Sequence, residues 1–154
     1  MPPPLPAPLA VDDAPSNPAP SVASELAAAA IGGAIGAILR YLAYALIPVI
    51  GPDLVLDAAY STLIVNLLGA CLLGALYGRV AAGLGHPLLR PFLGVGVLGS
   101  FTTYSTLILE SSEMTRDFGP GRALALVVVS IVLGLAAFHV GRRLTRPTRG
   151  ASPR

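Results

Sequence analysis

Four long apolar stretches, separated by short polar links, occupy most of the chain. They cover about residues 25–47, 59–80, 88–114 and 123–140. A stretch of about 20 apolar residues is long enough to cross the hydrocarbon core of a bilayer as an α-helix. Glycine and proline mark the links at residues 48–58 and 119–121, which predicts turns there. The pattern therefore predicts an all-α integral membrane protein with four transmembrane helices.

The two ends of the chain lack this apolar pattern. Residues 1–24 contain eight prolines within their first twenty positions, together with alanine, serine and two adjacent aspartates. Such a segment cannot bury enough apolar surface to fold, and it lacks the basic start and apolar core of a signal peptide. We predict a disordered extension at residues 1–24, a transmembrane domain at residues 25–143 and a basic, disordered tail at residues 144–154.

The third apolar stretch has an unusual centre. Glycines at Gly94, Gly96 and Gly99 precede a cluster of hydroxyl residues that ends at Thr106. Glycine weakens a helix, and hydroxyl side chains compete for backbone hydrogen bonds, so the third helix should be broken at its centre. Non-helical backbone at membrane depth is tolerated only where it is buried in protein or lines a cavity. The break predicts an ion or substrate site, and the alternative is a close helix crossing that needs only small residues.

Composition agrees with the membrane class and argues against a nucleic-acid partner. The chain is 54% hydrophobic and only 12% charged. Its ten basic residues are all arginine and give a net charge of +2, which is too small, and too confined to the C-terminal tail, to indicate nucleic-acid binding. The single cysteine, Cys71, lies in an apolar run, so neither a disulfide within the chain nor a thiolate metal site is available. We interpret it as a packing residue.

Three polar residues interrupt the other spans. Arg40, in the first span, either faces a protein partner, a carbonyl cage or water, or extends its side chain to the nearer headgroups. Asn66, in the second, offers two donors and an acceptor to a site or to a hydrogen bond between helices. Ser130, in the fourth, lines a pore or bonds to its own helix. Position alone leaves each pair of alternatives open.

Arginine is distributed unequally between the two sides of the predicted bundle. Four spans place both termini and the link at residues 81–91 on one side, and seven of the ten arginines lie there. Because cytoplasmic segments carry the excess of basic residues, both termini are predicted to be cytoplasmic. The seven are Arg79, Arg90, Arg142, Arg143, Arg146, Arg149 and Arg154.

Three motifs on successive spans resemble the CrcB/Fluc family of fluoride ion channels. They are GGAIGAILRY at residues 32–41, TLIVNLLG at residues 62–69 and GSFTTYST at residues 99–106. One motif alone would be weak, but three in the right order on the expected spans of a four-span protein are specific. The resemblance covers nearly the whole chain after residue 25.

The resemblance implies an antiparallel dimer of four-helix subunits with two fluoride pores and a structural Na⁺ at the dimer centre. By motif position, the backbone carbonyls of Gly99 and Thr102 would bind the Na⁺, and Asn66 would line the pore. The two third-helix phenylalanines of the family fall at Tyr104 and Leu107. The chain departs from the family here, because one aromatic ring gains a hydroxyl and the other is lost.

A fluoride pore also makes physical sense of the polar residues. Fluoride is small and tightly hydrated, so its pore must supply donors that replace the hydrogen bonds to water and must exclude larger anions. Arg40 is assigned a structural or vestibule position. No catalytic step is needed, because a negative cytoplasm expels an anion passively. The available donors are the Asn66 amide, the ring edge of Tyr104 and the hydroxyls of Thr103, Thr106 and Ser130.

Two other classes of function stay open at this point. A four-helix drug/proton antiporter subunit needs an ionisable carboxylate deep in a span, and the sequence places Glu25 and Glu110 near span ends. A non-transporting membrane assembly protein would explain the glycines, but it would not explain Asn66 together with the hydroxyl cluster.

The partner subunit is either a second copy of the chain or a paralogue. An antiparallel homodimer requires one sequence to insert both ways, which needs nearly balanced arginine on the two sides. Here seven arginines oppose Arg116 and Arg122, or these two and Arg40. This bias, and the replacement of an aromatic residue by Leu107, favour a heterodimer with a related subunit of opposite bias over the homodimer.

Overall fold

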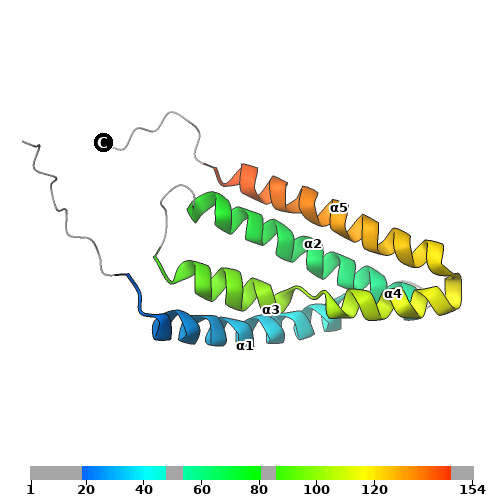
Figure 1. Ribbon diagram of the computed structural model, residues 1–154, viewed down its shortest axis with the longest axis horizontal. Helices are drawn as coiled ribbons and strands as arrows, with labels where there is room; N and C mark the ends of the chain where they lie inside the picture. Colours follow the sequence, from blue (N-terminus) through cyan, green and yellow to red (C-terminus); the bar gives the residue numbers. More distant parts are fainter. Residues whose placement is uncertain (1–18, 48–53, 81–85, 147–154) are drawn as a thin grey trace, which may run out of the picture.

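The computed structural model describes residues 19–47, 54–80 and 86–146, and these residues form an up-and-down helical bundle (Figure 1). Four of its segments are long and apolar enough to span a membrane, which confirms the predicted all-helical membrane class. The predicted extension before residue 19, the turn at residues 48–53 and the tail after residue 146 lie outside the described residues. The elements are α1 (Val22–Leu46), α2 (Leu54–Val80), η1 (Arg90–Leu98), α3 (Gly99–Phe101), α4 (Ser105–Phe118) and α5 (Pro120–Leu144).

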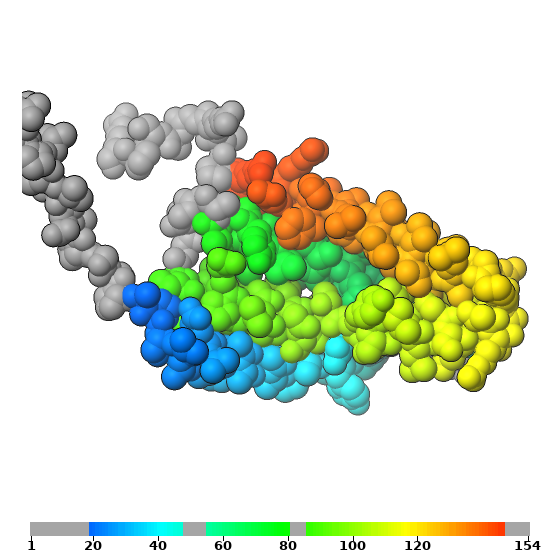
Figure 2. Space-filling view, in the orientation of Figure 1, coloured from blue at the N-terminus to red at the C-terminus, as the bar shows by residue number. Residues whose placement is uncertain are grey.

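Because successive spans run in opposite directions, the helix ends gather at the two ends of the bundle. The start of α1, the end of α2, the start of η1 and the end of α5 lie at one end, and the turn between α4 and α5 lies at the other (Figure 1). The space-filling view shows α1 and α5 along opposite edges, with α2 and the third span between them (Figure 2). Arg79, Arg90, Arg142 and Arg143 therefore lie at one end of the bundle, and Arg116 and Arg122 lie near the other.

Several helices are longer than the apolar pattern indicates. α1 begins at Val22, three residues early, because the Ser21 side chain caps it by accepting a hydrogen bond from the Ser24 N–H at 3.2 Å. α2 begins at Leu54, inside the predicted link, and Asp57 in its first turn suits the positive end of the helix dipole. α5 begins at Pro120, because proline fits the first turn of a helix, and the preceding Gly119 adopts a φ of 86°.

Glycines allow two pairs of helices to approach closely. In the pair of α1 and η1, a Cβ atom at Gly96 would lie 2.7 Å from the Ala29 carbonyl oxygen, and one at Gly32 would meet the Phe92 carbonyl oxygen. In the pair of α2 and α5, a Cβ atom at Gly141 would meet the Cys71 carbonyl oxygen. The small-residue face predicted at Gly32 is thus a true backbone contact surface.

The buried apolar core is small, as a bilayer allows. Only 11% of the apolar window of α1, and the same share of α5, is buried inside the chain. The main buried cluster joins Ala59, Met114 and Ala123 near the turn between α4 and α5. Most large apolar side chains therefore face outward, toward lipid or another subunit.

Candidate functional site

The third span leaves helical geometry after Phe101 and resumes it at Ser105. Thr102 is extended, with φ −76° and ψ 156°, and α4 begins three residues later. The glycines themselves do not break the helix: η1 and α3 stay helical through Gly94, Gly96 and Gly99 in a π-helix followed by one α-turn. The expectation that glycine would interrupt this span was wrong in mechanism, because these glycines serve close packing or sit in ordinary helical geometry.

Asn66 binds the backbone of the interruption from the neighbouring helix. Its Nδ2 donates to the Thr103 carbonyl at 2.9 Å, and its Oδ1 accepts from the Thr103 N–H at 2.8 Å. The carboxamide thus satisfies both polar groups of one backbone residue, as a neighbouring β-strand would. Nδ2 carries a second N–H, so Asn66 keeps one donor beyond this pair.

Arg40 reaches the same segment from α1. Its Nη1 donates to the Thr102 carbonyl at 3.4 Å, a long hydrogen bond, and the side chain is partly buried. Of the two alternatives for Arg40, the structure supports contact with a backbone carbonyl over extension to the headgroups. The guanidinium places a fixed positive charge beside the interruption.

The two carbonyls predicted to bind a cation differ in what surrounds them. Within the described residues, no backbone donor reaches the Gly99 carbonyl, since the Thr103 N–H that would reach it in a helix bonds to Asn66 instead. The Thr102 carbonyl has only the long bond from Arg40 and so keeps a free lone pair. Backbone oxygens of this kind suit a hard cation such as Na⁺, although two of them are fewer than such an ion takes.

The hydroxyl residues form a cap at the start of α4. Thr103 Oγ1 accepts from the Thr106 N–H at 3.2 Å and lies 2.8 Å from Thr106 Oγ1. Ser105 Oγ lies 3.4 Å from the same Thr103 oxygen. Thr103 is only 6% exposed and Thr106 is partly buried, whereas Ser105 is exposed. The structure therefore brings Asn66, Thr103 and Thr106 together, as the sequence predicted.

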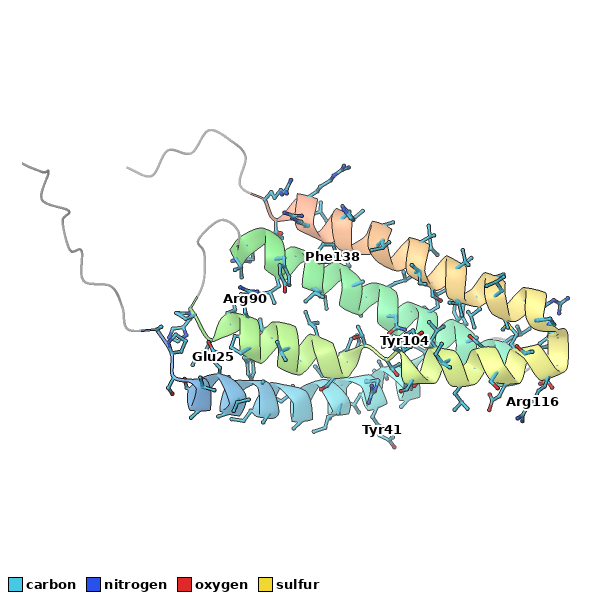
Figure 3. All side chains as sticks on the ribbon, viewed as in Figure 1. Glu25, Tyr41, Arg90, Tyr104, Arg116 and Phe138 are labelled. Atoms are coloured by element: carbon cyan, nitrogen blue, oxygen red, sulfur yellow. The ribbon has the colours of Figure 1, made fainter. Side chains whose placement is uncertain are left out.

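The remaining predicted pore residues occupy two different environments. Tyr104 is 71% exposed and lies at the interruption (Figure 3), whereas Leu107 is 5% exposed. Tyr104 is the N-cap of α4, with φ −92° and ψ −37°, and the two residues differ in exposure although they are only three positions apart. Ser130, on α5, is buried and its Oγ has no hydrogen-bond partner among the described residues, so of its two alternatives the bond to its own helix is not seen.

A buried polar chain links three helices one turn beyond the interruption. Thr62 Oγ1 donates to Glu110 Oε1 at 2.6 Å and lies 3.1 Å from the Tyr44 hydroxyl. Glu110 is 4% exposed, and its Oε2 has no partner within the described part of the chain. The sequence placed Glu110 near a span end and did not predict its burial inside the bundle. The sequence signal for this burial was the spacing of four residues between Thr106 and Glu110, because it sets both residues on one face of α4.

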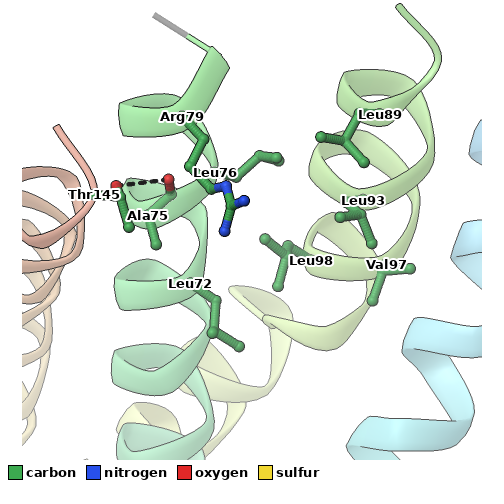
Figure 4. Close-up of a pocket in the computed structure, with 9 residues that line it drawn as sticks. All are labelled: Leu72, Ala75, Leu76, Arg79, Leu89, Leu93, Val97, Leu98 and Thr145. Atoms are coloured by element: carbon green, nitrogen blue, oxygen red, sulfur yellow. Dashed lines mark hydrogen bonds between the residues drawn. The ribbon is translucent and has the colours of Figure 1, made fainter. Parts of the chain in front are cut away.

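A separate apolar cavity of about 550 Å³ opens between α2 and η1 (Figure 4). Leucine and valine side chains line most of it, and Arg79 lies at its side (Figure 4). Thr145 closes one edge by donating from Oγ1 to the Ala75 carbonyl at 2.8 Å. None of the predicted ion-binding residues lines this cavity, so it is distinct from the interruption.

Known proteins resemble this chain across all four spans. The family model of the CrcB-like protein, Camphor Resistance (CrcB), matches residues 27–142. "Fluoride-specific ion channel FluC 2" of Thermobifida fusca is 41% identical over 73% of this chain and 81% of its own length. "Fluoride-specific ion channel FluC" of Novosphingobium aromaticivorans is 39% identical over 76% and 92%. "Fluoride-specific ion channel FluC 2" of Nocardia farcinica is 35% identical over 92% and 99%. The matched region contains the whole interruption and its partners on α1 and α2, and the chain belongs to the CrcB/FluC family.

Proposed function

We propose that this protein is a fluoride-specific ion channel rather than an enzyme. The observation that carries the proposal is the interruption at residues 102–104, where Asn66 holds backbone polar groups inside an apolar span. Broken helices at membrane depth present free carbonyls and N–H groups to ions. The relatives named as fluoride-specific channels support fluoride as the ion.

The proposed donors for fluoride lie in the interruption itself and on α2, α4 and α5. We assign the free N–H of Asn66 and the hydroxyls of Thr103, Thr106 and Ser130 to the pore lining. The buried Ser130 hydroxyl supports this assignment, because its donor has no partner within the described residues. The exposed ring of Tyr104 would complete the lining from the outer side of the subunit, with Leu107 behind it. Arg40 would attract the anion toward this segment.

A structural Na⁺ is proposed at the Gly99 and Thr102 carbonyls. The free Gly99 carbonyl and the weakly bonded Thr102 carbonyl support it. Bound there, Na⁺ would supply a fixed positive charge between subunits. Since one chain offers two oxygens, a second subunit would supply the other ligands.

The second subunit is proposed to lie antiparallel and to be a paralogue. Arginines Arg79, Arg90 and Arg142 lie at one end of the bundle, and Arg116 and Arg122 near the other. With seven arginines against two or three in the whole chain, a single orientation in the cell membrane with cytoplasmic termini is favoured. Fluoride would then leave the cytoplasm passively, driven by roughly 2.3 kcal/mol per charge at 100 mV.

Fluoride efflux from liposomes tests the proposal. Vesicles loaded with fluoride or chloride are reconstituted with this chain alone and together with a paralogous subunit, and the active preparation should release only fluoride. A proton gradient should not change the rate. Proton-coupled efflux would favour the antiporter class, for which the buried Glu110 supplies the necessary carboxylate. A folded but silent protein that gains efflux with a paralogous subunit would establish the heterodimer, and robust efflux alone would establish the homodimer.

A further inference from the structure

Asn66 replaces the two helical hydrogen bonds of Thr103. In a continuous α-helix the Thr103 N–H would donate to the Gly99 carbonyl, and the Thr103 carbonyl would accept from the Leu107 N–H. Here both groups bond to the Asn66 carboxamide, at 2.8 and 2.9 Å. Asn66 therefore occupies the two groups that would join α3 to α4.

Helical hydrogen bonding is interrupted over a short segment around Thr103. On one side, the Thr102 N–H still donates to the Leu98 carbonyl at 3.1 Å, as in a helix. On the other, the Ile108 N–H donates to the Tyr104 carbonyl at 3.1 Å. Between these two bonds, Asn66 takes both backbone groups of Thr103, and the carbonyls of Gly99, Ser100 and Phe101 have no backbone donor among the described residues.

Close packing fixes the distance from α2 to the interruption. A Cβ atom at Gly69, three residues after Asn66, would meet Thr102 Cγ2 and lie 3.3 Å from the Phe101 ring. This close approach of α2 places Asn66 within hydrogen-bond distance of Thr103.

We propose that Asn66 is a positioning residue for the cation site: its carboxamide keeps the third span interrupted at Thr103 and so leaves the Gly99 carbonyl free to bind Na⁺. This role rests on the proposed function and adds to it. It is compatible with donation to fluoride, because Nδ2 carries a second N–H. The Asn66 side chain would then connect the path of the anion with the site of the cation.

The test measures sodium binding and backbone protection, and neither requires ion flux. Full-length protein is purified in a large organic cation, and its thermal stability is followed during titration with NaCl. Wild type is compared with Asn66→Ala, with Asn66→Asp and with Cys71→Ala, which alters α2 away from the site. Hydrogen exchange is measured in the segment 99–107.

Sodium should stabilise wild type and Cys71→Ala equally. In Asn66→Ala, the sodium concentration for half-maximal stabilisation should rise about tenfold, equivalent to ~1.4 kcal/mol. In Asn66→Asp the shift should be smaller, because the carboxylate still accepts from the Thr103 N–H. The Thr103 amide should exchange faster in Asn66→Ala, whereas Asn66→Asp retains the acceptor for that N–H and should protect it better.

Three outcomes would overturn the inference: no stabilisation of wild type by sodium, an unchanged sodium midpoint in folded Asn66→Ala, or an unchanged exchange rate in Asn66→Ala. If Asn66→Ala does not fold, the sodium midpoint of Asn66→Leu, which keeps the branched side-chain shape and lacks both polar groups, decides. Loss of fluoride selectivity in wild-type liposomes would instead overturn the proposed function, and sodium binding would still be measurable.

Discussion

Two adjacent segments of the third span show opposite relations between sequence and conformation. Residues 90–101 contain three glycines and remain helical, whereas residues 102–104 contain none and leave the helix. The segments differ in their neighbours. Gly96 lies against the backbone of α1, and the backbone of Thr103 is bound by a side chain of α2. The interruption thus coincides with a polar partner on the next helix and not with the glycines.

This comparison assigns separate tasks to the two segments. The glycine segment brings backbones together, so its requirement is steric. The hydroxyl segment exchanges helical hydrogen bonds for bonds to Asn66, so its requirement is a specific donor and acceptor. Substitutions should therefore affect assembly in the first segment and ion handling in the second.

The largest effect is expected from a side chain in the glycine segment. In Gly96→Val, the new Cβ would lie 2.7 Å from the Ala29 carbonyl oxygen and 2.8 Å from the Gly32 Cα, both of them backbone atoms that cannot rotate away. We expect a loss of at least about 3 kcal/mol, the upper end of overpacking costs, and little folded protein. Gly134→Ala is the control, since a Cβ there meets nothing within 4 Å. Thermal unfolding and size-exclusion profiles measure both, and a stable Gly96→Val protein would contradict the backbone contact.

A smaller effect, on flux, is expected from Asn66→Asp. An ionised carboxylate would face the Thr103 carbonyl without a donor and would repel fluoride. Losing about 1.4–3 kcal/mol of the interaction between residue 66 and fluoride corresponds to a reduction in efflux of about 10- to 100-fold. Size exclusion and circular dichroism should still report a folded, assembled protein. Efflux equal to wild type would return Asn66 to a purely structural hydrogen bond between helices.

Glu110 offers a matched pair of variants outside both segments. Glu110→Leu removes the acceptor of the Thr62 hydroxyl and leaves buried polar groups unpaired, which should cost about 1–3 kcal/mol of unfolding free energy. Glu110→Gln retains an acceptor oxygen and places an NH₂ group where Oε2 has no partner, so its stability should stay within about 0.5 kcal/mol of wild type. Thermal unfolding of the two variants side by side measures the difference. Equal destabilisation by both would indicate that the negative charge, and not the hydrogen bond, is required.

Apolar length and motif order were enough to predict the four spans, their up-and-down order and the meeting of Asn66 with Thr103 and Thr106. The sequence was less informative where a contact depends on relative helix position. Glu110 follows an apolar run and precedes several charged residues, so its sequence neighbours indicated a surface turn. Its burial depends on Thr62 of α2 lying opposite, a distance of 48 positions along the chain.

The same limit applies to the exposure of Tyr104 and Leu107. Their spacing of three residues sets them near one face of a helix, but it does not say which of them a neighbouring helix covers. Tyr104 caps α4 and is 71% exposed, whereas Leu107 is 5% exposed.

The smallest effect is expected from Thr102→Ser, which separates backbone from side-chain roles within the interruption. Serine retains the hydroxyl that donates to the Leu98 carbonyl at 3.0 Å and leaves the Thr102 carbonyl unchanged. It loses only the methyl group that packs near Gly69, worth about 0.8 kcal/mol. If the carbonyl binds sodium, the sodium midpoint for thermal stabilisation should shift by no more than about twofold, well under the tenfold that ~1.4 kcal/mol would give. A sodium titration of Thr102→Ser beside wild type measures this, and a tenfold shift would mean that the threonine side chain, not its carbonyl, determines the site.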